Sequence, residues 1–349
     1  MSAPHIWIAT NHGAIGGGEV MLLQIAEALR ELGREVTVVA PSHPPALAEA
    51  ARAKGLDVVV LGADDRASWM LALRRWRRRH REGILWCNGL VPAAATAGQP
   101  NRIVHLHQYA TGKKAILARI ARMRALMTVV PSQHFAGTVP GSFVLLNWTG
   151  AFEPTSRHHV PGEPFVVGYL GRLGTDKGVH VLTDAVGELD RRMPGGVRLR
   201  LAGESRFVNP RAAQVVERAL TEIEPLIDRV GWVPPQELFD AIDVLVAPSV
   251  APEPFGLVAA EAMSAGVPVI VSDAGGLPEV VGTENGRILP AGDGRALVEE
   301  IAALMQPGAE AGVVEQQERW AQRFSPAAGR ERVAALIALA DRAPSRARR

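Results

Sequence analysis

Residues 243–278, DVLVAPSVAPEPFGLVAAEAMSAGVPVIVSDAGGLP, constrain the fold of this chain more than any other stretch. The apolar run VLVA stops at Pro248 and predicts a buried strand, and VPVIV predicts a second one. Helix formers fill the segment between them from Gly256 to Ala265, and Gly266 stands where a glycine commonly ends a helix. This order predicts a βαβ unit, whose loop lies at the carboxyl end of a parallel sheet.

Two glutamates occupy this unit. Glu253 lies in the loop, and Glu261 follows eight residues later inside the predicted helix. Because a helix rises about 1.5 Å per residue, the two carboxylates are too far apart to share one bond-breaking step. A helix N-terminus at this edge of a sheet is a common site for phosphate-bearing ligands. We therefore interpret the glutamates as contacts to two different parts of one extended ligand.

Length and composition favour two domains. The chain has 349 residues, 47% of them hydrophobic, which is enough for two cores of about 160 residues each. A segment at 149–164 is rich in proline, glycine and polar residues, lacks periodicity and predicts a linker. We expect an N-terminal domain at 1–160, a C-terminal domain at 161–325, and a last helix with a basic tail at 326–349.

The first half opens with a strand, a glycine-rich loop and a helix, as doubly wound α/β domains do. The loop, NHGAIGGGE, includes Gly16, Gly17 and Gly18. It lacks the G-x-G-x-x-G spacing of a dinucleotide fingerprint and the Gly-Lys-Ser/Thr of a P-loop, which argues against a nicotinamide-dependent dehydrogenase. The loop is either a tight turn or a point where the backbone approaches a ligand phosphate or sugar.

Two histidines follow another predicted strand of the first half, in RIVHLHQYATGKK. His105 and His107 share a face of an extended chain, so at least one should face a ligand if the strand ends there. Both can equally be structural. A metal site needs a third ligand, and none lies nearby in the sequence. Lys113 and Lys114 are interpreted as contacts to an anionic acceptor or as solvated side chains.

Charge is divided unequally along the chain. Residues 1–150 carry 17 Lys and Arg against 9 Asp and Glu, and the remainder carries 21 against 27. The basic half favours anionic partners, although we expect no nucleic-acid partner. Its densest run, RRWRRRHRE at 74–82, predicts either a solvated helix face or a patch that contacts anionic lipid head groups.

The compartment is predicted from cysteine usage and from the absence of targeting signals. The chain has one cysteine, Cys87, which rules out an internal disulfide and is interpreted as a small buried residue. Neither a signal peptide nor an apolar run of membrane-spanning length is visible. We expect a cytoplasmic protein, with peripheral membrane contact through 74–82 as an open addition.

The second half begins with a strand, FVVGYLG, and the loop GRLGTDKG. Arg172 and Lys177 flank this turn, and two cations beside a helix N-terminus suit a diphosphate. Further along, the strand-end backbone of Gly231, Trp232 and Val233 is a candidate for reading the edge of a base. Trp232 is alternatively a core residue.

Three motifs together resemble the family 4 glycosyltransferases, which are retaining enzymes of GT-B fold that use nucleotide sugars. They are G-R-x-x-x-x-K-G at 171–178, E-x7-E at 253–261 and P-V-I-x-x-x-x-G-G-x-P-E at 268–279. The resemblance covers nearly the whole chain and is most specific in its second half. It implies an α/β GT-B architecture in which two Rossmann-like doubly wound domains face a central cleft.

The resemblance also implies roles for individual residues. Arg172 and Lys177 neutralise the donor diphosphate, Glu253 contacts hydroxyls of the donor sugar, and Glu261 binds the ribose. His107, with His105 as the alternative, approaches the reacting sugar. The glycine loop of the first half approaches the diphosphate, and backbone amides after Glu253 hold sugar and diphosphate. The implied donor-binding set is Gly16, Gly17, Gly18, Arg172, Lys177, Gly231, Trp232, Val233, Glu253, Phe255, Gly256, Leu257 and Glu261, and the implied catalytic set is His107, Arg172, Lys177 and Glu253.

We therefore expect a retaining glycosyltransferase that moves a hexosyl unit from a UDP- or GDP-linked sugar to an acceptor hydroxyl. No D-x-D signature demands a metal, so no metal or other cofactor is expected. A small molecule, a lipid-linked glycan and a polysaccharide end all fit as acceptor.

Two other functional classes are compatible with parts of this pattern. One is a GT-B epimerase or phosphorylase, although E-x7-E fits an epimerase less well and phosphorylases need a pyridoxal site and a longer chain. The other is a non-enzymatic two-domain ligand-binding protein, for which a secretion signal would be expected.

Overall fold

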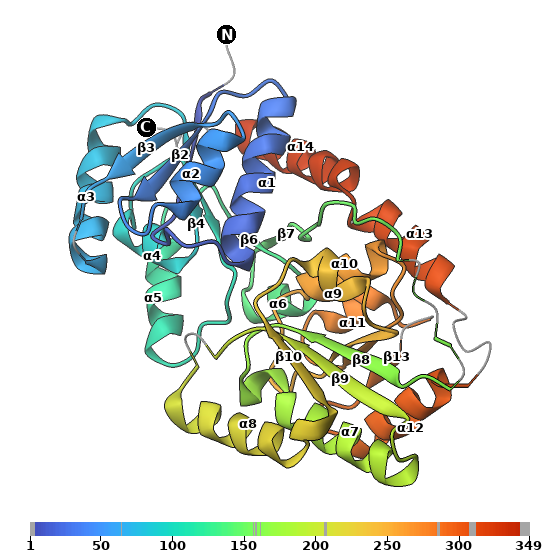
Figure 1. Ribbon diagram of the computed structural model, residues 1–349. Helices are drawn as coiled ribbons and strands as arrows, with labels where there is room; N and C mark the ends of the chain where they lie inside the picture. Colours follow the sequence, from blue (N-terminus) through green and yellow to red (C-terminus); the bar gives the residue numbers. More distant parts are fainter. Residues whose placement is uncertain are drawn as a thin grey trace. The chain divides into compact units, whose positions relative to one another are not determined.

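The computed structural model divides the chain into two compact units (Figure 1). The first consists of Met1–Trp148 with Pro326–Arg349, and the second of Thr149–Ser325. The described residues are 4–63, 65–155, 157, 159–160, 162–205, 208–284, 287–306 and 312–342. The basic tail predicted at the end of the chain lies outside them beyond residue 342.

The division falls before the predicted linker and not within it. Thr149 N donates to the Phe324 carbonyl at 3.0 Å, and Thr155 N donates to the Ala265 carbonyl at 2.8 Å. These bonds group residues 149–160 with the second unit, whereas the sequence analysis assigns them to the first domain. A polar, proline-rich segment has no hydrophobic period from which its packing partner can be predicted.

In the described residues, the first unit contains a seven-stranded sheet of order β3-β2-β1-β4-β5-β6-β7, with neighbouring strands parallel. The central strands are mostly apolar and buried because helices cover both faces of the sheet. The strand order reverses between β1 and β4. The strands are β1 (Ile6–Ala9), β2 (Val36–Pro41), β3 (Asp57–Leu61), β4 (Ile84–Asn88), β5 (Arg102–His105), β6 (Met127–Val130) and β7 (Phe143–Val144).

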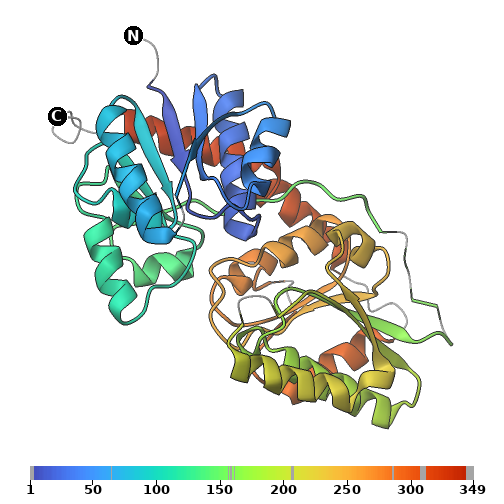
Figure 2. The same cartoon turned by 60° about the vertical axis from the view of Figure 1, so that its left-hand side comes forward.

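The helices of the first unit form two layers around this sheet (Figure 2). Helix α1 packs against α14 in one layer, and α3, α4 and α5 pack side by side in the other. Helix α5 begins at Lys113, in a segment that the sequence analysis treats as a loop. The helices are α1 (Gly17–Glu31), α2 (Ala46–Ala53), α3 (Arg66–Arg79), α4 (Leu90–Ala95), α5 (Lys113–Ala121), α6 (Gln133–Thr138) and α14 (Pro326–Arg342).

The second unit has a six-stranded parallel sheet of order β10-β9-β8-β11-β12-β13 in its described part, with the reversal between β8 and β11. Its strands are β8 (Phe165–Leu170), β9 (Val197–Ala202), β10 (Ile227–Gly231), β11 (Val244–Ala247), β12 (Val269–Ser272) and β13 (Arg287–Leu289). Its α-helices are α7 (Val179–Arg192), α8 (Pro210–Glu222), α9 (Pro235–Phe239), α10 (Leu257–Ser264), α11 (Leu277–Val281), α12 (Gly294–Leu304) and α13 (Val313–Arg323). Both units are thus doubly wound α/β units, as predicted.

The predicted burial of Cys87 and the predicted absence of a membrane-spanning helix can be compared with the structure. Cys87 is fully buried in β4, with its sulfur 3.5 Å from Thr96 Oγ1, which confirms it as a small core residue. Among the described residues, no helix combines the length and the apolar character that crossing a membrane requires.

The basic run at the end of α3 is not one uniform solvated face. Arg77 is only 2% exposed, and its guanidinium donates to the carbonyls of His80, Glu82 and Gly83 at 2.7, 3.1 and 3.1 Å. Burial lowers the pKa of Arg77 to about 10. The neighbouring Arg78 is exposed. Arg77 is therefore a structural residue that terminates α3 and joins it to the start of β4.

We expect Arg77→Ala to lower the free energy of unfolding by about 3 kcal/mol, because it removes a buried side chain and leaves several partly buried carbonyls without their donor. The matched substitution Arg78→Ala should change it by no more than about 0.5 kcal/mol. Urea unfolding followed by tryptophan fluorescence measures both. Equal effects of the two substitutions would contradict the structural role of Arg77.

Candidate functional site

Most of the predicted site residues follow strands at or next to the point where the strand order of each sheet reverses, whereas residues 231–233 follow an edge strand. In the first unit this point lies between β1 and β4, and in the second it lies between β8 and β11. At such a point the loops that leave the carboxyl ends of the two strands run in opposite directions and leave room for a ligand. The two points are described separately below.

In the second unit, backbone contacts join the loop after β8 to the loop after β11. The Asp176 carbonyl accepts hydrogen bonds from Val250 N and Ala251 N, both at 3.0 Å. Gly178 has φ +71°, and a Cβ there would lie 1.8 Å from the Pro248 carbonyl oxygen. Only glycine allows this approach, so the motif glycine of GRLGTDKG is required by the packing of the two loops.

Side chains strengthen the same junction. Lys177 Nζ donates to Glu253 Oε1, and Ser249 Oγ donates to the same oxygen at 2.6 Å. Arg172 pairs with Asp176 at 2.8 Å. The structure therefore brings together three residues that the sequence analysis assigns to one site, although Lys177 and Glu253 are 76 positions apart.

The loop after β11 leads into α10 through Gly256. This residue has φ +117°, and a Cβ there would lie 2.6 Å from Leu277 Cδ2. The Phe255 side chain is 2% exposed and its ring lies 5.5 Å from that of Phe324, so only the backbone of Phe255 is placed to contact a ligand. The first N–H groups of a helix lack intrahelical acceptors. Leu257 N is the first such group of α10, and the contact of residues 255–257 with a donor stays a prediction.

Glu261 lies one turn into α10 and is partly buried. Burial raises its pKa to about 7. The carboxyl group is therefore about half ionised at neutral pH, unlike an exposed glutamate.

Residues 231–233 follow β10, which is an edge strand of the second sheet. The Gly231 carbonyl accepts from Gly203 N at 2.7 Å, which ties the ends of β9 and β10 together. Trp232 is 74% exposed. The alternative interpretation of Trp232 as a core residue is therefore wrong.

In the first unit, Asn88 at the end of β4 connects the glycine loop to His107. Asn88 Nδ2 donates to the Gly18 carbonyl at 3.0 Å, and Asn88 Oδ1 lies 2.7 Å from His107 Nε2. Because a carbonyl can only accept, the amide nitrogen must face Gly18 and the amide oxygen must face the histidine. His107 therefore carries its proton on Nε2 and keeps Nδ1 as an acceptor.

The two histidines differ in accessibility. His105 is fully buried, and Trp86 Nε1 donates to its Nδ1 at 3.4 Å. Its ring lies 4.0 Å from that of His107, which is partly exposed. Desolvation lowers the pKa of His107 to about 4 and also lowers that of His105. Both are neutral at pH 7, and His107 is the one with surface to offer a ligand.

The sequence analysis does not single out three buried polar residues of the first unit, Thr10, Glu19 and Asn88. Asn88 is 3% exposed, and Glu19, 8% exposed, accepts from Thr10 Oγ1 at 3.2 Å. Burial raises the pKa of Glu19. Each lies at the end of an apolar strand or at the start of a helix. A polar residue that ends an apolar strand, as in ILWCN, is the sequence signal that points to Asn88.

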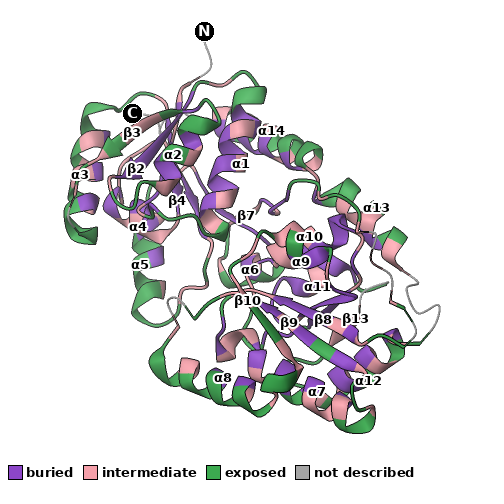
Figure 3. Cartoon of the chain, in the orientation of Figure 1, coloured by how far each residue is buried: buried purple, intermediate pink, exposed green. Residues whose placement is uncertain are grey.

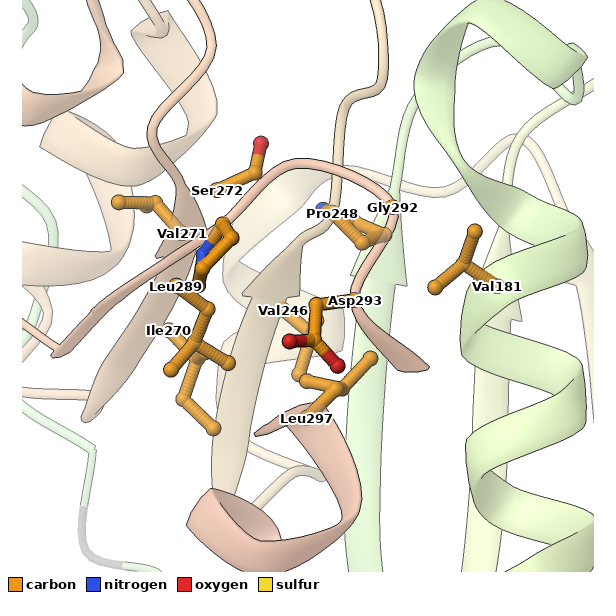
Figure 4. A pocket seen from close by; sticks show the side chains of 11 residues that line it. Val181, Val246, Pro248, Ile270, Val271, Ser272, Leu289, Gly292, Asp293 and Leu297 are labelled. Atoms are coloured by element: carbon orange, nitrogen blue, oxygen red, sulfur yellow. The ribbon is translucent and has the colours of Figure 1, made fainter. Parts of the chain in front are cut away.

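A small hollow of about 250 Å³ opens elsewhere in the second unit, beside β11 and β12 (Figure 4). Its lining is mostly apolar and includes Val181, Val246, Ile270 and Leu297. The Asp293 carboxylate on its rim caps α12 by accepting from Ala296 N at 2.9 Å. None of the predicted donor-binding residues lines this hollow.

Within the described ranges, no group of three His, Cys, Asp or Glu side chains is arranged to hold a metal ion.

Two family models match the chain, one in each half. The model described as "Glycosyltransferase Family 4" matches residues 15–141, and the one described as "Glycosyl transferases group 1" matches residues 164–307. Together they cover most of the sequence. The chain belongs to the family 4 glycosyltransferases.

Curated relatives are about one third identical to the chain over a matched segment that covers part of each protein. The D-inositol 3-phosphate glycosyltransferase of Nocardia farcinica is 35% identical over 128 residues, which are 35% of this chain and 28% of the relative. That of Corynebacterium efficiens is 33% identical over 178 residues, which are 48% of this chain and 41% of the relative. The match thus spans less than half the length of each relative.

Solved structures share the fold at low sequence identity. HepE from Anabaena, in complex with UDP-glucose, has a TM-score of 0.80 at 22% identity, covering 96% of this chain and 99% of the other. Sucrose-phosphate synthase from Thermosynechococcus elongatus has a TM-score of 0.76 at 21% identity, covering 95% and 98%. These similarities and the two parallel-sheet units confirm the predicted GT-B fold class.

We expect Asn88→Asp to raise the pKa of His107 from about 4 towards or above its usual 6.5, because a carboxylate beside the ring stabilises the imidazolium. Asn88→Ala should not raise it by this route. Histidine ring resonances followed by NMR across pH 4 to 8 measure the change. An unaltered midpoint in Asn88→Asp would contradict the hydrogen bond between the two residues.

Proposed function

We propose that this glycosyltransferase moves a hexosyl unit from a UDP- or GDP-linked sugar to an acceptor hydroxyl, with retention of configuration and without a metal ion. The observation that supports the proposal most is the junction of Lys177 with Glu253 beside the start of α10. In this proposal Lys177 binds phosphate oxygens, Glu253 accepts from sugar hydroxyls, and the first backbone N–H groups of α10 donate to the nucleotide sugar. The complexes of HepE with UDP and with UDP-glucose support a UDP-linked donor.

In this proposal Arg172 and Lys177, which pair with Asp176 and Glu253, bind phosphate oxygens when the donor binds. Arg172 and Asp176 are each nearly half exposed, so their ion pair contributes little and is easily replaced. A diphosphate offers Arg172 a bidentate partner and offers Lys177 a second anion. Both cations then stabilise the negative charge that develops on the leaving diphosphate, which is where electrostatic catalysis acts.

The remaining contacts divide the donor by its chemistry. Glu253, oriented by Ser249, accepts from hydroxyls of the sugar, and Glu261 accepts from the ribose. The backbone at 231–233, beside the exposed Trp232, reads the base.

In this proposal the first unit has donor-binding groups of its own. The N–H groups of Gly16, Gly17 and Gly18 at the start of α1 suit the diphosphate. His107, neutral and protonated on Nε2, offers Nδ1 to a sugar hydroxyl.

The bond changes balance without a further reactant. The bond between the anomeric carbon and the diphosphate oxygen breaks, and the acceptor oxygen bonds to the anomeric carbon from the same face. The acceptor proton passes to the departing phosphate oxygen. Retention follows because entry and departure share one face of the sugar.

The acceptor is proposed from charge and from the relatives. The basic excess of the first half favours an anionic acceptor, and the curated relatives are named for D-inositol 3-phosphate. A phosphorylated polyol or a phosphate-linked lipid fits both observations. We place the reaction in the cytoplasm. Any contact of residues 74–82 with lipid would exclude Arg77, because its guanidinium is engaged within the protein.

Calorimetric titration with UDP, GDP, ADP and NAD tests the donor class. We expect micromolar binding of UDP or GDP that is the same in magnesium and in chelator. With the matching nucleotide sugar and an acceptor, NMR of the product should show the anomeric configuration of the donor.

The variant Lys177→Ala is measured in both assays to test the proposed phosphate contact. Loss of one charged phosphate contact should lower turnover by about 100-fold, whereas the surface control Arg191→Ala on α7 should leave it unchanged. Binding of NAD alone, an inverted product, or unaltered turnover in Lys177→Ala would each overturn the proposal.

We expect nucleotide affinity to increase with pH through the pKa of Glu261, about 7. Only the carboxylate can accept from both ribose hydroxyls, and its ionised fraction rises roughly tenfold between pH 6 and pH 8. In Glu261→Gln the contribution of Glu261 to this increase in affinity should be absent. Any increase caused by ionisation of the diphosphate should remain. Parallel pH dependence in the two proteins would contradict the ribose contact.

A further inference from the structure

Helix α5 and the turn after it expose a cluster of large apolar side chains. Ile116 is 63% exposed, Leu117 40%, Ile120 46% and Met123 57%. Figure 3 shows the exposed surface running along α5. The spacing of 116, 117 and 120 places three of these side chains on one side of the helix. The opposite side is anchored, because Ala118 and Ala121 are buried and α5 packs against α4.

The charge around this cluster has one sign. No Asp or Glu occurs in the sequence between Glu82 and Glu153. Lys113, Lys114, Arg119 and Arg124, which lie in or beside α5, are all exposed. Basic side chains thus border the apolar cluster, and no acidic residue from this stretch of sequence offsets them.

Single exposed apolar residues are normal on protein surfaces, but four within eight positions are not explained in that way. A helix that carries an apolar side bordered by Lys and Arg has the pattern of an interfacial helix, which lies in the plane of a membrane surface. Its apolar side chains enter the boundary between head groups and acyl chains, and its cations approach anionic head groups.

We propose that α5, with residues 113–124, docks the first unit on an anionic lipid bilayer. The positive charge around α5 favours an anionic bilayer over a second copy of the chain as the binding partner. A second copy would bring the same positive surface against itself. The inference goes beyond the proposed function and does not depend on the identity of the donor. It places the lipid contact on a different helix from the one predicted at 74–82.

Helix α3 lacks half of the required pattern. Its exposed arginines include Arg75, Arg78 and Arg79, but among its described side chains Leu71, 45% exposed, is the one exposed large apolar residue. Because α3 and α5 both pack against α4, the arginines of α3 add long-range attraction to the same surface. These arginines do not provide apolar side chains that could insert into the bilayer.

The position of α5 gives the contact a functional meaning. The helix begins six residues after His107, at the carboxyl end of β5. A bilayer held at α5 would present lipid head groups close to the segment after β5 that contains His107. A lipid-linked anionic acceptor would therefore be delivered from the surface on which the protein sits.

Vesicle flotation of the full chain tests the proposal. One set of vesicles is an equimolar mixture of phosphatidylglycerol and phosphatidylcholine, and the other is phosphatidylcholine alone. We expect binding to the anionic vesicles only. The double variant Ile116→Ser, Ile120→Ser should lower this binding about tenfold or more, because it removes the two inserted side chains.

Two control variants separate insertion from charge. Leu71→Ser removes an equally exposed apolar residue of α3 and should leave binding unchanged. Lys113→Gln, Lys114→Gln should lower binding roughly tenfold and reduce its sensitivity to salt. Thermal unfolding verifies that each variant is folded, and calorimetric nucleotide binding without vesicles reports on the proposed function independently.

The proposal is overturned if the wild type ignores anionic vesicles, or if Ile116→Ser, Ile120→Ser binds them as the wild type does. It is also overturned if light scattering shows a dimer that this double variant loses, because a second copy would then cover the apolar cluster.

Discussion

The close contact between the loop after β8 and the loop after β11 is the constraint on which the second unit depends. Backbone bonds to the Asp176 carbonyl and the missing side chain of Gly178 bring the two loops together. Lys177 then reaches Glu253, so that each charge is compensated by the other. The two side chains are thus oriented at little cost, because neither charge is buried alone. In the proposed function, Lys177 binds phosphate oxygens and Glu253 binds sugar hydroxyls.

In the first unit, the loops beside the reversal of strand order are joined by neutral side chains instead of an ion pair. Asn88 joins the glycine loop to the end of β5 by hydrogen bonds to Gly18 and His107. Desolvation keeps His107 neutral, and it favours the protonated form of the buried Glu19. In the proposed function this difference is useful, since sugar hydroxyls need oriented acceptors whereas the diphosphate needs compensating charge.

Counting charges along the sequence proved a poor guide to the surface of the first unit. The arginine run in α3 is the densest basic stretch of the sequence. One of its members, Arg77, nevertheless donates its guanidinium hydrogen bonds to backbone carbonyls of the protein itself. The apolar residues of α5, which resemble any helix core in sequence, are the ones that face solvent. Whether a side chain is exposed depends on which other element covers it, and α4 covers only one side of α5.

The sequence by itself determined most of the strands and helices, the doubly wound character of the two units and the motif residues at 171–178 and 253–261. These properties are local: apolar runs, helix-ending glycines and fixed spacings are visible in a window of ten to twenty residues. The tertiary structure decided that Lys177 meets Glu253, that His107 and not His105 is accessible, and that residues 149–160 belong with the second unit. Each of these depends on which strands are neighbours in a sheet, and strand order is set by packing of the whole chain rather than by any single stretch of it.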